Sequence, residues 1–125
     1  MANSIKNAFG NVVNDTTNAL KWLSYASKDV ASGIQSAYGL NNNQVAVSMK
    51  QAGYGAYDIA DAIKNGIGAG IDEVASALNE AGFGIVEIAE AIKDAFDAGL
   101  SAVKSALESA GYGFLEIAKA IADLF

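Results

Sequence analysis

A phrase of fourteen residues, QAGYGAYDIADAIK at positions 51–64, returns 29 residues later as EAGFGIVEIAEAIK and once more as SAGYGFLEIAKAIA. Shifting the frame back by 29 residues gives a more divergent copy, WLSYASKDVASGIQ. A fixed period of about 20 to 50 residues is typical of a repeat array, in which each unit buries its apolar face only against its neighbours. The sequence therefore predicts a stack of similar units.

The repeats fill the whole chain, which we interpret as one domain, 1–125. Ile5 and Phe9 lie 29 residues before Ile34 and Tyr38, so half a copy precedes the full ones. The expected boundaries of the half repeat and the four full repeats are 1–10, 11–39, 40–68, 69–97 and 98–125.

The first half of each copy predicts a short helix with a start and a stop signal. Residues whose side-chain oxygen can cap a helix N-terminus occupy one aligned column: Asn14, Asn43, Asp72 and Ser101. A second column is expected to end the helix, because glycine adopts the left-handed conformation without a Cβ clash: Ser24, Gly53, Gly82 and Gly111. Ser24 departs from this pattern, and we expect it to cost about 1 kcal/mol.

The second half of each copy predicts another helix, beginning near Gly55, Gly84 or Gly113. Its apolar stripe follows the i, i+4, i+8 spacing of a helix face, as in Ile88 and Ile92. No segment alternates as a strand does. The expected helices lie near 3–9, 15–23, 27–38, 44–52, 56–67, 73–81, 85–96, 102–110 and 114–124. The predicted fold is all-α, a short α-solenoid of stacked helical hairpins.

The phrase AGYGxxEIAxAIKxxF resembles the Ala-rich tandem repeats of some bacterial surface and secreted proteins. The resemblance covers nearly the whole chain and brings no catalytic residue with it. It implies an extracellular or cell-surface location, although the sequence has neither a Sec-type signal peptide nor an apolar run of the roughly 18 residues that span a membrane.

The composition excludes several kinds of chemistry. His, Cys and Arg are absent, which removes most zinc, copper and iron ligation and most nucleophile–base pairs. We therefore expect no enzyme activity, no metal and no cofactor. The phrase also resembles a helix-turn-helix, but the first turn of its second helix contains Asp58, Glu87 or Glu116, which phosphates would repel. Nucleic acid is not an expected partner.

Two motifs have both a chemical and a structural interpretation. Asp58 with Asp61, and Glu87 with Glu90, could form an acid/base pair or a cation site, but they fit a solvated helix face better. Lysines three residues after each pair are expected to be their ion partners: Lys64 and Lys93. Glycines alternate in one connection between helices, where a flexible or closely packed turn is favoured over a phosphate loop: Gly66, Gly68 and Gly70.

Both ends of the stack are expected to expose apolar surface, because no polar capping repeat is apparent. Residues 1–57 carry four lysines and two acids, whereas residues 58–125 carry four lysines and twelve acids, within a net charge of −6. Unlike ends with unlike charge favour a heterologous, head-to-tail contact. Both terminal helices are of the second type, so this joint must differ from the internal junctions. The candidate interface residues are Ile5, Phe9, Trp22, Phe114, Leu115, Ile121, Leu124 and Phe125.

The sequence thus predicts a structural protein that assembles with copies of itself into a filament or sheath-like extracellular fibre. One alternative is a helical-repeat scaffold that binds a protein or carbohydrate, with its ends closed by dimerisation. Another is a membrane-active amphipathic protein, which the acidic charge disfavours. Trp22 stands in a column that is otherwise polar, so it either covers the gap beside the half repeat or contacts a partner.

Overall fold

The computed structural model describes the backbone of residues 2–125 and the side chains of residues 8–125. The described residues form helices and turns and include no strand, so the predicted all-α class is confirmed. The elements are α1 (Ala2–Trp22), α2 (Ser27–Tyr38), α3 (Asn42–Gln51), α4 (Ala56–Ala62), the π-helix η1 (Ile63–Ile67), α5 (Ile71–Ala81), α6 (Ile85–Phe96), α7 (Leu100–Ser109) and α8 (Phe114–Leu124).

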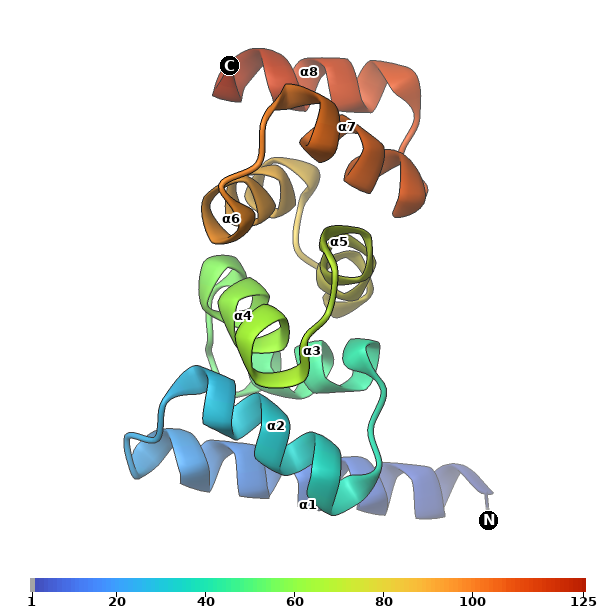
Figure 1. Ribbon diagram of the computed structural model, residues 1–125. Coiled ribbons are helices and arrows are strands. Elements are labelled where there is room, and N and C mark those ends of the chain that lie inside the picture. The colour runs from blue at the N-terminus through green and yellow to red at the C-terminus, as the bar shows by residue number, and fades with distance from the viewer. Residues whose placement is uncertain (1) are drawn as a thin grey trace.

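The helices pack in two rows that run along the molecule, with α1 at one end and α8 at the other (Figure 1). In one row α3 packs on α5 and α5 on α7. In the other, α2 packs on α4 and η1, α4 on α6, and α6 on α8. Aligned columns of the repeat fill the core between them, such as the fully buried Ile34, Ile63 and Ile92. We interpret this layout as a short solenoid.

The turn inside each hairpin follows the predicted glycine column. Gly53, Gly82 and Gly111 have φ of 96°, 96° and 99°, and Ser24 adopts the same left-handed conformation with φ of 65°. The aromatic residue that follows each of these glycines packs back against the core: Tyr54, Phe83 and Tyr112. After Ser24, by contrast, Tyr25 is 56% exposed. The first turn therefore has the same backbone but lacks the aromatic anchor.

The predicted N-cap column is wrong by two residues. The caps of α3, α5 and α7 are Asn41, Gly70 and Gly99. Asn41 forms a capping box with Gln44, through bonds of 2.8 and 2.9 Å. The first buried residue inside each of these helices is its fourth, Val45, Val74 or Val103, so apolar periodicity does not mark where the helix begins. The proposed caps therefore lie inside the helices: Asn14, Asn43, Asp72 and Ser101.

The two helices expected at 3–9 and 15–23 are in fact one, α1, which passes through Gly10 without a break. Glycine in a helix interior costs about 1 kcal/mol, and packing offsets this. Val13 and Thr17 are buried where α1 packs on α2 and α3, and the Thr17 hydroxyl lies 2.8 Å from that of Ser48. Residues 1–10 thus share one helix with the start of the first full repeat, and this helix lies across both rows (Figure 1).

Lys64 and Lys93 connect successive repeats. The prediction that they are ion partners of acids on their own helices is therefore wrong. Lys64 donates to the carbonyl oxygen of Ala95 at 2.7 Å, and its ammonium lies 5.1 Å from the centre of the Phe96 ring. Lys93 does the same with the Leu124 carbonyl oxygen and the Phe125 ring, at 3.4 and 4.8 Å. Each lysine thus neutralises the C-terminal end of a helix in the next repeat.

Gly66 lies where the connection with alternating glycines packs most closely against another helix. It lies in η1 directly against the backbone of α2, and a Cβ at this position would overlap the carbonyl oxygen of Lys28. Gly68 ends η1 in the left-handed conformation, and Gly70 caps α5. Each glycine of the motif therefore has a structural role, and none of them lies in a strand-to-helix phosphate loop.

The Tyr54 hydroxyl is buried without a hydrogen-bond partner, whereas the equivalent Tyr112 hydroxyl donates to Asn79 Oδ1 at 2.9 Å. Burial raises the pKa of Tyr54 above its ordinary value of 10.0, and the Asp58 carboxylate raises it further. The folded state therefore favours the neutral phenol. This preference supports folding below pH 10 and is lost as the pH rises through the pKa of the folded protein.

We expect Tyr54→Phe to leave the free energy of unfolding at pH 7 unchanged or to raise it by about 1 kcal/mol, because it removes an unpaired buried hydroxyl. The variant should also lose less stability than the wild type between pH 9 and about pH 11. Denaturant unfolding followed by circular dichroism measures both effects. Tyr57→Phe, at an exposed position, is the control. A loss above about 1 kcal/mol at pH 7 would mean that the hydroxyl has a partner.

Candidate interaction surface

The outward side of α8 is an apolar surface on which no helix of the described residues packs. The internal helix α6 buries residues on both sides, since α4 packs on one and α8 on the other. In α8 only Ile117 and Ala120 are buried. Ala118, which aligns with the fully buried Ala89, is exposed. The side of α6 that packs on α8 thus has an equivalent on α8, and this side of α8 is exposed.

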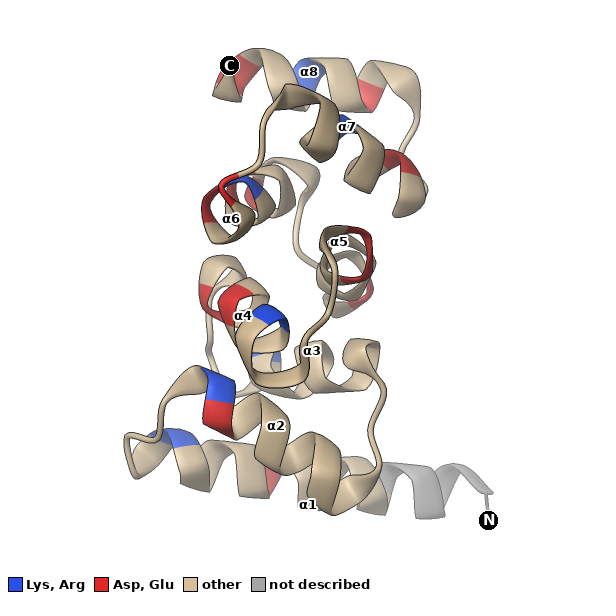
Figure 2. Ribbon diagram, in the orientation of Figure 1, with Lys and Arg blue, Asp and Glu red and all other residues tan. Residues whose placement is uncertain are grey.

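We call this surface the α8 face and define it by five apolar residues at helical spacing: Phe114, Leu115, Ala118, Ala122 and Phe125. The three large side chains are 74%, 71% and 54% exposed. Lys119 borders the face and is the one basic residue of α8, between Glu116 and Asp123 (Figure 2). The α8 face thus combines large exposed apolar side chains with a positive charge at its edge.

The outward side of α1 forms a second surface at the opposite end of the molecule (Figure 1). We call it the α1 face and define it by Ala8, Val12, Asp15, Ala19 and Trp22, all exposed and on one side of the helix. Val12 is 51% exposed and Trp22 is 87% exposed. The carboxylate of Asp15 lies among these apolar residues, so this face carries a negative charge.

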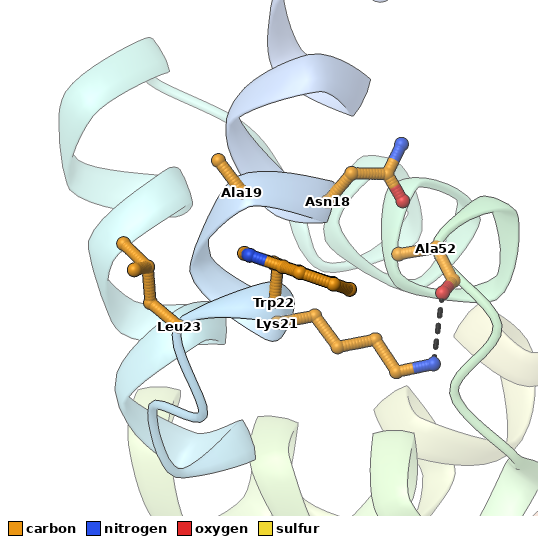
Figure 3. Close-up of a pocket in the computed structure, with 6 residues that line it drawn as sticks. All are labelled: Asn18, Ala19, Lys21, Trp22, Leu23 and Ala52. Atoms are coloured by element: carbon orange, nitrogen blue, oxygen red, sulfur yellow. Dashed lines mark hydrogen bonds between the residues drawn. The ribbon is translucent and has the colours of Figure 1, made fainter.

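Trp22 covers no gap beside the half repeat, so that interpretation is wrong. Its indole extends from the end of α1 over an open depression lined by Asn18, Ala19 and Leu23 (Figure 3). The neighbouring Lys21 also lines this depression and donates to the carbonyl oxygen of Ala52 at 3.0 Å (Figure 3). Leu23 is itself 63% exposed. A contact with a partner remains the interpretation of this residue.

The structure groups some of the predicted interface residues and separates others. Phe114, Leu115 and Phe125 share the α8 face, whereas Ile121 and Leu124 are half-buried against the core. Phe9 is 44% exposed and meets the Tyr38 ring edge-on, with the ring centres 5.9 Å apart. The Ile5 side chain lies outside the described residues.

Sequence reasoning missed the polar surface of α7, which lies beside the α8 face. Lys104 pairs with Glu108 at 3.8 Å, the one ion pair among residues 8–125. In the two preceding repeats the column of Lys104 holds buried alanines, Ala46 and Ala75. A charged residue in a column of buried alanines is the signal that marks an end layer. The α7 part of this end of the stack is therefore largely polar. Leu100 in α7 is 50% exposed, and the other large exposed apolar side chains of this end lie on the α8 face.

The carboxylate pairs lie on a solvated surface. Asp58, Glu87, Glu90 and Asp94 line a shallow groove between α4 and α6. Among the described residues, no group of three or more carboxylates is placed to hold a metal ion. In the same part of the chain, no helix combines the length and the apolar composition needed to cross a lipid bilayer.

Comparison with known proteins adds no relative to this picture. No known protein family, curated protein sequence or solved structure matches this chain.

Proposed function

We propose that this chain is a structural protein that assembles with copies of itself, head to tail, into an extended filament. The observation that carries this proposal is the α8 face, where Phe114 and Leu115 are 74% and 71% exposed. Contiguous apolar side chains of this kind mark sites of protein association. The α1 face at the opposite end differs from it, and a contact between unlike faces repeats without limit unless it closes into a ring.

The proposal is tested by light scattering and negative-stain electron microscopy across protein concentration. We expect the wild type to form filaments whose length grows with concentration. Leu115→Ser should raise the concentration required for assembly by about tenfold or more, because it removes a large apolar side chain from the joint. Tyr57→Ser is the matched control, since Tyr57 holds the same column in an internal repeat and is 50% exposed. A small monodisperse species at high concentration would contradict the proposal.

A second candidate is a helical-repeat scaffold that binds an extended peptide or a carbohydrate. A groove between α1 and α3 supports it, because apolar Phe9 and Val47 lie there beside amide side chains that can pair with a polar ligand, among them Asn14, Asn43 and Gln44. This function requires no assembly. Scattering from monomers at all concentrations would favour it over the filament.

A further inference from the structure

We propose that the α1 face of one copy packs on the α8 face of a second copy, and that Asp15 of the first pairs with Lys119 of the second. This inference rests on the proposed head-to-tail assembly and specifies its joint. It is carried by the shapes of the two faces, their charges, and the position of Lys119 in the repeat.

The shapes of the two faces suit each other. The α1 face alternates the large Val12 and Trp22 with the small Ala8 and Ala19. The α8 face likewise places Ala118 and Ala122 between larger side chains. Helices pack by setting the large residues of one into the depressions above the small residues of the other. Both faces therefore have the relief that a helix-on-helix contact requires.

The charges of the two faces are opposite. Asp15 lies among the apolar residues of the α1 face, and Lys119 borders the α8 face. The one ion pair in the part of the chain whose side chains are described joins two other residues, so Asp15 and Lys119 both remain available. The C-terminal half, 58–125, carries four lysines against twelve acids. Two α8 faces in contact would bring two such acidic halves together, which disfavours a tail-to-tail joint.

Lys119 also departs from its own repeat column. The aligned residues in the second and third full repeats are Asp61 and Glu90, so the charge is reversed only in the layer whose outward face is uncovered. A reversed charge at this position is unnecessary for stacking within the chain, because the internal layers stack with an acid there. It is what a contact with Asp15 of another copy requires.

The test is a charge swap between two variants, Asp15→Lys and Lys119→Glu, followed by sedimentation and electron microscopy. Each variant alone brings like charges together at every joint, and we expect its critical concentration for assembly to rise about tenfold or more. An equal mixture of the two variants should assemble again. Every joint between unlike copies in that mixture pairs opposite charges, so the two variants should alternate along the filament.

Lys28→Glu and Asp29→Lys serve as matched controls, since both residues are exposed on α2 and lie on neither face. Circular dichroism verifies that each variant folds. If the wild type assembles but the two swapped variants assemble equally well, or their mixture does not recover, the pairing is wrong and the filament proposal stands. If the wild type does not assemble at any concentration, both proposals fail.

Discussion

Replacing Gly66 by alanine is expected to lower the free energy of unfolding by about 3 kcal/mol or more. The added methyl group would occupy the space of the Lys28 carbonyl oxygen, so η1 and α2 must separate. That separation also opens the apolar contact around Ile63, which is fully buried in η1. Backbone atoms cannot rotate aside as a flexible side chain can, which is why the effect should be large. Denaturant unfolding followed by circular dichroism measures it.

Gly33→Ala is the matched control for this prediction. Gly33 lies within α2, where a Cβ would meet nothing within 4 Å. Alanine in an unobstructed helix interior is expected to stabilise the protein by about 0.5–1 kcal/mol. The two substitutions are chemically identical and should have opposite signs. If Gly66→Ala is as mild as the control, the close approach of η1 to α2 is wrong.

Ile92→Ala is expected to cost about 4 kcal/mol, whereas Ile121→Ala in the same column should cost about half as much. Ile92 is fully buried between layers, and Ile121 is half-buried because nothing covers its outward side. At Ile92 the substitution leaves a closed cavity in the core. At Ile121 the space left by the removed atoms is partly open to solvent. Chemical unfolding at a protein concentration low enough to keep the chain monomeric measures both values.

The same pair of variants reports on assembly. If a second copy covers the α8 face, the cost of Ile121→Ala should rise toward that of Ile92→Ala as the protein concentration increases, because the site becomes buried. Equal costs in the monomer would mean that the outward side of α8 is already covered within the chain. The structure would then be wrong at this end.

Much of the local structure could be predicted from the sequence alone. The bounds predicted for α2, α6 and α8 agree with the structure, and the left-handed column at Ser24, Gly53, Gly82 and Gly111 is confirmed. These features depend on a few neighbouring residues. A glycine that tolerates positive φ ends a helix wherever the chain goes next, and an apolar residue every third or fourth position makes a buried face in any stack.

Three errors share a physical cause, which is contact between residues far apart in the sequence. Separate helices were expected at 3–9 and 15–23, but α1 is continuous because its packing on α2 and α3 outweighs the weak helix propensity of Gly10. Lys64 and Lys93 were assigned to acids on their own helices, but the stack places the ends of the next repeat's helices within their reach. The polar layer of α7 was missed because the burial of a column differs between an internal and an end repeat.

The candidate surface was predicted only in part. Exposed apolar residues at the start of α8 were anticipated because Phe114 and Leu115 replace Ala56 and Tyr57 of the second full repeat, which makes this helix the most apolar of its column. The positions of Asp15 and Lys119 at the two end faces were not anticipated. Their relation to the two faces depends on the continuity of α1 and on which side of α8 its neighbours leave open.

The period, the helical class and the residues at which each hairpin turns could all be predicted from the order of the residues, because these properties follow from local backbone preferences repeated four times. The continuity of α1, the π-helical form of η1 where it packs against α2, and the exposed face of each end helix depend instead on contacts between helices. The reason is that every repeat carries nearly the same apolar stripe. Whether a given stripe is core or surface depends on which layer, if any, lies against it.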